Sequence, residues 1–383
     1  MTIALAAGEA SGDQLGAALA KALNQRCPDI QLTGVTGLAM QTAGVQSLAS
    51  IEQLSVMGLT EVLRHLPHLV QFRRSLRRQL LESDSALFVG IDAPDFNLGL
   101  ARQLRRRGMP TAQFVAPSVW AWRRYRISKI ARSVDLLMTL FPFEAQHFVD
   151  SGLNVRYVGH PLADELPMEP DKAGARRQLA LSAGQPLIAL LPGSRSAEIK
   201  RHAGLMINTA RELQQADASL QTMLLLAEPD HLELFRQAAG RDPAELGIAL
   251  YCGQTRTGLS AADVAIAASG TVTLEALLCK TPMSVFYRLS PGSYWLAQRL
   301  VQTRWIALPN VLANDNLVPE RLQQQAQAKT LAVDALCWLE QTHRAEVFRE
   351  RAVQLHQQLA CSAAQRAAAV LLETFGLALS RTR

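Results

Sequence analysis

Two carboxylates, Asp92 and Asp95, follow an apolar run and could serve in acid–base chemistry. The run Ala86–Ile91 predicts a buried strand, and Pro94 with Asp95 predicts the start of a helix. Asp95 suits that helix start, where an acidic side chain is favourable for structural reasons. Asp92 has no such role, and it could accept a proton from a substrate hydroxyl if burial raises its pKa above about 3.9. A hydrogen-bonded structural aspartate is the alternative interpretation.

A second stretch has the composition of an anion-binding loop. Leu187–Leu191 predicts a buried strand, Gly193 ends it, and Ser194 is placed to cap a helix that begins near Ser196. The unpaired amides of such a helix start favour an anion by about 0.3–1 kcal/mol, and Arg195 adds a full positive charge. The alternative is an ordinary strand-to-helix turn with a surface arginine.

A third loop repeats this arrangement in the second half of the chain. The predicted strand Val264–Ala267 is followed by small and hydroxyl-bearing residues that suit a second phosphate or a ribose, namely Ser269, Gly270 and Thr271. Glu275 lies one turn into the next helix, where it could accept both ribose hydroxyls; an acid that favours the helix dipole is the alternative. Asn310 adds an amide at the same edge.

Two loops of the first half could contact an acceptor. The loop after the opening apolar run carries three polar side chains, Glu9, Ser11 and Asp13, which could bind acceptor hydroxyls or simply cap a helix. Its glycine spacing is not that of a dinucleotide-binding loop. A later loop combines apolar surface with positive charge through Ser118, Trp120 and Arg123, which suits an amphiphile with an anionic head. Tryptophans packed in the core are the alternative there.

The segment Leu54–Leu81 combines apolar residues at helical spacing with several arginines. Pro67 is expected to end one helix and to open the next. An amphipathic helix packed on its own sheet is one interpretation. The other is an interfacial helix whose arginines bind anionic headgroups, which assigns membrane contact to Leu63, Leu66, Leu69 and Val70.

The elements that must position these loops alternate between short apolar runs and helical patterns. The predicted strands are Ile3–Ala6, Gln31–Val35, Ala86–Ile91, Thr111–Val115, Leu136–Thr139, Val155–Val158, Leu187–Leu191, Met223–Leu226, Ile248–Tyr251, Val264–Ala267 and Met283–Phe286. Predicted helices include Asp13–Gln25, Leu98–Arg107 and Pro142–Asp150. The region Pro161–Ala173 has the composition of a linker, and Ala332–Leu379 is expected to be helical throughout. This alternation predicts an α/β protein with parallel sheets.

Length and composition agree with two such domains. A chain of 383 residues with 49% hydrophobic residues can bury two cores. Its net charge is +6, and nine Arg or Lys but no Asp or Glu lie between Phe96 and Val134, a basic patch suited to phosphates, nucleic acid or an anionic membrane.

Several classes of protein are disfavoured. The five scattered cysteines form no C-x-x-C pair, so we expect neither a zinc site nor disulfides, which fits a reducing cytosol. We also expect no signal peptide, because no basic region precedes the first apolar run. No membrane-spanning segment is expected, because no window reaches 18 uninterrupted apolar residues.

Taken in order, the motifs resemble those of the lipid-A-disaccharide synthase family, glycosyltransferases of the GT-B type. The matching pieces cover nearly the whole chain: G-E-A-S-G-D from Gly8, G-I-D-A-P-D-F-N from Gly90, P-S-V-W-A-W-R from Pro117, V-G-H-P from Val158, L-P-G-S-R-x-x-E-I from Leu191, S-G-T-x-T-L-E from Ser269 and L-P-N from Leu308. Ala116 stands where the family commonly has serine, and Leu312-Ala313 is not followed by the usual glycine.

The resemblance implies two Rossmann-like domains facing across a cleft. They would be residues 1–165, which bind the acceptor and face the membrane, and residues 166–345, which bind the UDP-sugar. Helices in 346–383 would pack back on an N-terminal domain of the same or a partner chain.

The resemblance also implies an activity in lipid A and lipopolysaccharide biosynthesis. A diacylated glucosamine passes from UDP to the 6-hydroxyl of a diacylated glucosamine 1-phosphate, with inversion, to give a β-1,6 disaccharide 1-phosphate and UDP. Asp92 is the expected base and Asp95 the second candidate. Arg195 with the Gly193–Ser194 amides would hold the diphosphate, and Glu275 would hold the ribose, with Asn310 and the Ser269–Thr271 loop completing the nucleotide site.

No metal or other cofactor is expected for this reaction. The protein would be peripheral on the inner face of the inner membrane, would bind no nucleic acid, and could form a homodimer. The alternatives are another UDP-sugar transferase or epimerase of this architecture, or a non-catalytic basic nucleotide-binding protein.

Overall fold

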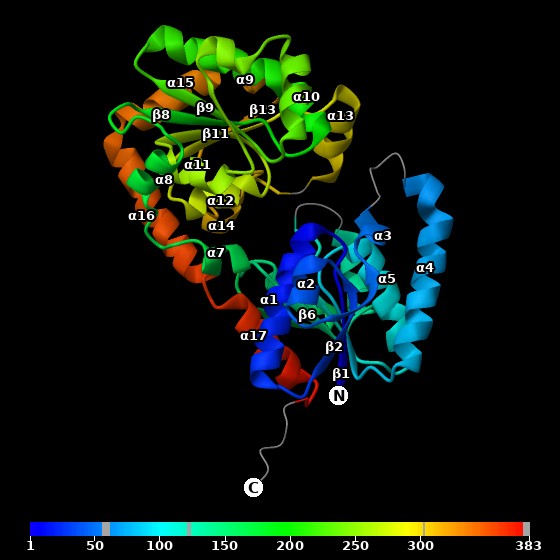
Figure 1. The fold of residues 1–383 in the computed structure, drawn as a ribbon. Coiled ribbons are helices and arrows are strands. Elements are labelled where there is room, and N and C mark those ends of the chain that lie inside the picture. The colour runs from blue at the N-terminus through cyan, green and yellow to red at the C-terminus, as the bar shows by residue number, and fades with distance from the viewer. Residues whose placement is uncertain (56–61, 121–123, 302, 378–383) are drawn as a thin grey trace. The chain divides into compact units, whose positions relative to one another are not determined.

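The computed structural model describes residues 1–55, 62–120, 124–301 and 303–377. The chain forms two compact units, shown in Figure 1, and crosses between them twice. Met1–Asp164 and Leu359–Arg383 form the first unit, and Glu165–Gln358 forms the second. Residue 346, where a boundary was expected from the resemblance, lies inside the continuous helix α16 (Thr342–Leu359), so the chain returns to the first unit only at the end of that helix.

The first unit is built on a parallel sheet. In the described part of the chain its seven strands have the order β3-β2-β1-β4-β5-β6-β7. Their bounds are β1 Thr2–Ala6, β2 Gln31–Thr36, β3 Gln46–Ser50, β4 Leu87–Gly90, β5 Thr111–Phe114, β6 Leu136–Thr139 and β7 Asn154–Tyr157. Successive side chains of β1 enter different cores: Ile3 and Leu5 pack on one face, and Ala4 and Ala6 on the other. Both faces are therefore buried, as expected of a parallel sheet.

Helices cover both faces of this sheet. Their bounds are α1 Ala10–Arg26, α2 Leu38–Thr42, α3 Glu52–Ser55, α4 Val62–Glu82, α5 Pro94–Arg105, α6 Ile127–Ala131, α7 Pro161–Glu165 and α17 Ala363–Thr374, with 3₁₀ turns η1 Arg124–Arg126 and η2 Ala145–Ser151. α17 packs beside α1, and its Leu371 joins Leu19 and Leu23 in one core. Leu76 of α4 and Leu100 of α5 join the other core.

The second unit has a parallel sheet of six strands in its described residues, in the order β10-β9-β8-β11-β12-β13. The strand bounds are β8 Leu187–Leu191, β9 Gln221–Leu226, β10 Ala249–Cys252, β11 Val264–Ala268, β12 Met283–Tyr287 and β13 Glu320–Leu322. Its helices and 3₁₀ turns are α8 Lys172–Gln178, α9 Ser196–Ala216, α10 Asp230–Ala239, η3 Pro243–Leu246, α11 Thr255–Ala261, α12 Val272–Leu278, α13 Pro291–Leu300, α14 Leu308–Ala313, η4 Gln323–Gln325, α15 Ala328–Glu340 and α16.

Every predicted strand is confirmed to within two residues at each end, and two short strands, β3 and β13, were missed. The expected helix Pro142–Asp150 was wrong in type, because η2 is a 3₁₀ helix. The expected linker contains α7, and the C-terminal helical region is interrupted near Gln341 and near Ser362. The expected break at Pro67 was also wrong, because α4 runs from Val62 through Pro67 to Glu82.

The strand order creates one switch point in each sheet. β1 and β4 are neighbours, but the chain leaves β1 toward β2 and leaves β4 toward β5, in opposite directions along the sheet. β8 and β11 have the same relation in the second unit. Crevices for ligands form beyond the carboxyl ends of the strands at such points. The Gly8 and Asp92 loops meet at the first switch point, and the Arg195 and Ser269 loops meet at the second.

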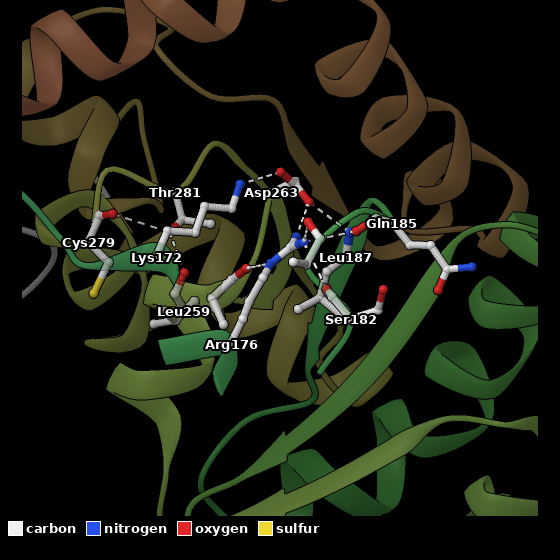
Figure 2. A network of polar contacts seen from close by, with 11 residues as sticks. Lys172, Arg176, Ser182, Gln185, Leu187, Leu259, Asp263, Cys279 and Thr281 are labelled. Carbon is white, nitrogen blue, oxygen red and sulfur yellow. Dashed lines mark hydrogen bonds and ion pairs between the residues drawn. The ribbon is translucent and has the colours of Figure 1, made fainter. Parts of the chain in front are cut away.

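At the amino-terminal edge of the second sheet, opposite the switch point, a network of polar contacts links the sheet to α8 (Figure 2). Asp263, just before β11, accepts hydrogen bonds from the Arg176 guanidinium at 2.7 Å and the Leu187 amide at 2.8 Å, and it pairs with Lys172. Arg176 is buried and also donates to the carbonyls of Ala261, Ser182, Ala183 and Gln185. Each nitrogen of the buried guanidinium thus has an acceptor, and the network anchors α8 to the sheet, so its role is structural.

Candidate functional site

A pocket of about 290 Å³ lies at the switch point of the second sheet. It collects residues from the loops after β8 and β11, the start of the helices that follow them, and the end of β12: Gly193, Ser194, Arg195, Glu198, Ser269, Gly270, Thr271, Glu275 and Tyr287 among others. The structure therefore brings together all the predicted nucleotide-site residues except Asn310. The Arg195 side chain is 80% exposed and is free to reach a ligand at the pocket mouth.

Ser194 does not cap α9, contrary to the sequence-based expectation. The helix begins at Ser196, and Arg195 occupies the cap position. Glu198, in the first turn, folds back so that its Oε2 accepts the Ser194 amide at 3.1 Å and the Arg195 amide at 3.3 Å. The Ser194 amide, which was expected to bind an anion together with the Gly193 amide, is therefore already held by a carboxylate of the protein itself. The Arg195 side chain, which is 80% exposed, remains for a ligand.

Glu275 lies at the pocket wall and is bound by Arg256. The Arg256 Nε donates to Glu275 Oε1 at 3.3 Å, and its Nη1 donates to Glu165 Oε2 at 2.9 Å. Burial raises the pKa of Glu275, and the hydrogen bond and charge of Arg256 oppose that rise. The carboxylate is thus desolvated and held in place, with one oxygen that no hydrogen bond from Arg256 occupies.

Asn310 is not one of the residues that line the pocket. It is fully buried; its Nδ2 donates to the Val318 carbonyl at 2.9 Å and to Glu320 at 2.8 Å, and its Oδ1 accepts the Val318 amide at 2.8 Å. These bonds occupy both ends of the amide, so the side chain orders the loop before β13. Ser269 plays a similar part, because its hydroxyl donates to the Ile306 carbonyl at 2.7 Å.

Asp92 lies at the switch point of the first sheet, directly after β4. Its Oδ1 accepts the Gly8 amide at 2.6 Å, and its Oδ2 accepts the Glu9 amide at 3.1 Å. Burial raises the pKa of Asp92 to about 6; the charge of Glu9 adds to the rise, and the two amides oppose it. A carboxylate of this pKa at a sheet crevice has the property that general-base catalysis needs near neutral pH.

The surroundings of Asp92 fix its position. A Cβ on Gly12 would lie 2.1 Å from Asp92 Oδ2, so α1 can start here only with glycine at that position. Ala93 has φ +41°, a left-handed conformation that non-glycine residues rarely adopt. The Asp92 carbonyl accepts from Asn97 Nδ2 at 2.7 Å and from Gln113 Nε2 at 3.2 Å. Two buried amides thus clamp the peptide that carries the carboxylate.

Asp95 has a different environment. Its side chain is 78% exposed and pairs with Arg126. It lies in the first turn of α5, as its structural interpretation predicts. A depression of about 450 Å³ between the two loops is lined by Gly8, Glu9, Leu54, Ala93, Pro94, Asp95 and Phe96.

Of the other residues predicted to contact the acceptor, some are exposed and one is buried. Glu9 and Ser11 are exposed at the start of α1. Asp13 is buried and accepts the amides of Gly37, Ala39 and Met40 at 2.8, 2.8 and 3.1 Å, so it caps α2 rather than its own helix and is not open to an acceptor. This corrects the expectation for Asp13.

The tryptophan loop is only partly described. Ser118 is exposed, and Trp120 is half-buried with its ring against Phe143 at a centroid distance of 5.3 Å. Arg123 lies outside the described residues.

The residues of α4 that were predicted to contact the membrane differ in their exposure to solvent. Leu69 is buried in the core with Leu76 and Leu80, so its assignment to lipid contact was wrong; helical spacing places it on the face toward α5. Val70 is 42% exposed, and Arg74 and Arg78 are exposed. The side chains of Leu63 and Leu66 lie outside the described residues, so their assignment stays a prediction.

Sequence reasoning missed Tyr287 and the role of Glu198. The Tyr287 hydroxyl donates to Glu198 Oε1 at 2.9 Å from 89 residues away, a contact that only the fold creates. The spacing of Glu198, three residues after the cap position, was an available signal, since a glutamate there often binds the amide of the cap residue. Among the described residues no cluster of His, Cys, Asp and Glu could hold a metal ion. Within the same residues no helix has the length and apolarity needed to span a bilayer.

Comparison with known proteins identifies relatives over nearly the full length. Residues 3–371 match the family described as lipid-A-disaccharide synthetase. The lipid-A-disaccharide synthase of Chromohalobacter salexigens is 46% identical over 369 residues, which cover 96% of this chain and 95% of that protein.

Solved structures share the fold at much lower identity. S. aureus MnaA in complex with UDP has a TM-score of 0.67 at 13% identity, with 100% of this chain and 98% of that chain covered. Anabaena HepE in complex with UDP and glucose has a TM-score of 0.55 at 14% identity, with 98% and 100% covered. The fold is thus the GT-B architecture of two Rossmann-like parallel-sheet units.

Proposed function

This chain belongs to the lipid-A-disaccharide synthase family and is a glycosyltransferase of lipid A biosynthesis, and we propose that it condenses UDP-2,3-diacylglucosamine with 2,3-diacylglucosamine 1-phosphate, using Asp92 as base. The observation that carries the assignment of the base is the position of Asp92: it is held by two amides at the switch point of the first sheet, with its pKa raised by burial to about 6.

The proposed reaction is a single displacement that inverts the anomeric carbon. The 6-hydroxyl oxygen of the acceptor forms a bond to C1 of the donor sugar while the bond from C1 to the diphosphate oxygen breaks. Asp92 takes the hydroxyl proton, and the electron pair leaves with UDP. The protein must therefore provide one proton acceptor and a stabilising charge for the leaving diphosphate.

Asp92 suits the proton transfer better than Asp95. With a pKa of about 6, most Asp92 side chains are ionised at pH 7, yet they are more basic than an ordinary carboxylate. Asp95 is exposed to water, and its carboxylate is already paired with the Arg126 guanidinium.

The pocket of the second unit suits the UDP moiety. Arg195, with its side chain largely exposed, is placed to bind the diphosphate, where a charge-assisted hydrogen bond contributes about 1.5–3 kcal/mol. Glu275 has a free acceptor position for ribose hydroxyls while Arg256 holds its other oxygen. Arginine and helix amides can stabilise the leaving diphosphate, so the proposed mechanism uses no metal ion.

The exposed face of α4 is the proposed contact with the inner face of the inner membrane. Val70 supplies exposed apolar surface, and Arg74 and Arg78 supply charges that attract anionic headgroups, each by about 1 kcal/mol near the surface. Leu63 and Leu66 extend this surface in the prediction from the sequence. Docking there would let the acyl chains of both substrates stay in lipid.

Mass spectrometry of the purified protein with both substrates tests the function. We expect a tetraacyl disaccharide 1-phosphate and an equal amount of UDP, with and without EDTA. A second UDP-sugar isomer of equal mass, separated by chromatography in a reaction without acceptor, would favour an epimerase. Loss of turnover in EDTA would contradict the metal-free mechanism. Competition between UDP and oligonucleotides for binding separates the enzyme from a nucleic-acid-binding protein.

A further inference from the structure

The Gly193–Arg195 loop is held by buried side chains that have no part in the proposed reaction. Glu198 Oε2 accepts the Ser194 and Arg195 amides, and Glu198 Oε1 accepts the Tyr287 hydroxyl at 2.9 Å. His202, one turn further along α9 and fully buried, places Nδ1 2.6 Å from the Pro192 carbonyl. Two side chains of one helix thus reach back to the loop that precedes it.

The loop conformation depends on this carboxylate. Gly193 has φ +122°, and a Cβ there would lie 2.5 Å from Glu198 Oε2, so loop and carboxylate are fitted to each other at van der Waals contact. Arg195 Nη1 lies 3.7 Å from Glu198 Oε1, while most of the Arg195 side chain faces solvent. The carboxylate therefore fixes the backbone of Arg195 and attracts one edge of its guanidinium.

A carboxylate in a diphosphate site should repel the ligand unless it is neutralised or already committed to donors. Glu198 has three hydrogen-bond donors and a neighbouring cation, and only 9% of the residue is exposed. Burial and contact with Glu198 raise the pKa of Tyr287 to about 12, so the hydroxyl keeps its proton throughout the neutral range. The Tyr287 hydroxyl can thus donate its hydrogen bond to Glu198 throughout the neutral range.

We propose that Glu198, itself oriented by Tyr287, is a positioning residue that aims Arg195 at the diphosphate of the nucleotide. The carboxylate does not touch the ligand; it keeps the Ser194 and Arg195 amides turned inward, so that the guanidinium is presented at the pocket mouth. This inference rests on the proposed nucleotide site. It predicts that losing the orientation of Glu198 weakens the contact with phosphate and leaves the contacts with uracil and ribose in place.

Binding of UDP and of uridine to Tyr287→Phe, measured by calorimetry with competition, tests this. We expect UDP to bind about tenfold more weakly, equivalent to about 1.4 kcal/mol, and uridine to bind within about twofold of wild type. Tyr251→Phe is the matched control, because it also removes a tyrosine hydroxyl hydrogen bond in the second unit, to the Leu179 carbonyl at 2.6 Å, but lies outside the pocket lining. It should bind both ligands as wild type does.

Glu198→Gln provides a second variant if Tyr287→Phe folds poorly. It should weaken UDP by a similar factor, and the double variant should be no weaker than the worse single variant, since both act on one contact. Equal weakening of UDP and uridine, or unchanged UDP binding in both single variants, overturns the proposal. Arg195→Ala separates failure of the proposed nucleotide site from failure of the positioning role. If Arg195→Ala leaves the affinity for UDP unchanged, the proposed nucleotide site is wrong. If Arg195→Ala weakens UDP binding but Tyr287→Phe binds UDP normally, only the positioning role is refuted.

Discussion

Replacing Asp92 with asparagine removes the proposed proton acceptor and leaves the contacts that hold its backbone in place. The asparagine Oδ1 can still accept the Gly8 amide, and the clamp on the Asp92 carbonyl by Asn97 and Gln113 involves only the backbone. We therefore expect the loss to be that of general-base catalysis alone, a reduction of about 100-fold to 10,000-fold in turnover. Binding of UDP should be unchanged, because the nucleotide pocket belongs to the other unit.

The stability of this variant follows from the same pKa. The pKa of Asp92 is about 6 in the folded protein and 3.8 in the reference state, so the fold prefers the protonated form. Ionised Asp92 is therefore destabilising by about 2–3 kcal/mol at pH 7, and this penalty develops as the pH rises from about 4 to about 6. Asparagine removes that penalty and loses one accepted amide hydrogen bond, of about 1.5–3 kcal/mol when the acceptor is charged. The two effects offset each other, so the free energy of unfolding should change little.

A pH series of transfer rates gives the sharpest assay. For the wild type, kcat/KM should rise tenfold per pH unit well below pH 6 and level off above it, and it should be about tenfold below the plateau at pH 5. Asp92→Asn should lose this limb as well as its rate. Asp95→Asn, which alters an exposed and ion-paired carboxylate, should keep both. A folded Asp92→Asn protein with turnover within threefold of wild type, or an unchanged pH profile, would refute Asp92 as base.

Three further predictions concern the proposed nucleotide site and the proposed membrane-contacting face of α4. Arg195→Ala should weaken UDP binding by about 2 kcal/mol in calorimetry, since one charge-assisted contact is lost, and its thermal midpoint should stay near that of wild type because the side chain is 80% exposed. Val70→Ser should reduce co-sedimentation with anionic vesicles without lowering stability; retention on the vesicles would exclude this face of α4. Leu69→Ala should instead lower the free energy of unfolding by about 2–4 kcal/mol in denaturant titrations, because the side chain is in the core, and an unchanged midpoint would contradict that packing.

The places of the functional loops could be predicted because they depend on local patterns. An apolar run of five residues marks a buried strand, and polar residues directly after it must lie at the carboxyl edge of a parallel sheet. Asp92, Arg195 and Ser269 do lie in the loops that follow β4, β8 and β11. The strands β3 and β13 escaped because they are short edge strands with polar residues such as Gln46 and Glu320, without an apolar run.

The partners of the polar side chains could not be predicted, because they come from other parts of the chain. Asp13 caps α2 from 24 to 27 residues away, and Asn310 is occupied by the loop that follows it. In each case the residue type suggested an open ligand contact, and the fold used its hydrogen-bonding capacity internally. Buried polar groups must be satisfied by some partner, and the sequence does not identify which one.

The two switch points show how similar anchors lead to different chemistry. In each unit a carboxylate accepts two successive amides of the loop after a central strand: Asp92 accepts those of Gly8 and Glu9, and Glu198 accepts those of Ser194 and Arg195.

The two carboxylates differ in the side chains beside them. Asp92 has the acidic Glu9 beside it, which adds to the effect of burial and raises its pKa toward neutrality, so it can exchange a proton. Glu198 instead accepts the Tyr287 hydroxyl at 2.9 Å and lies 3.7 Å from the Arg195 guanidinium. The proposed base and the proposed anchor therefore share their position at the sheet and differ in the side chains that contact them.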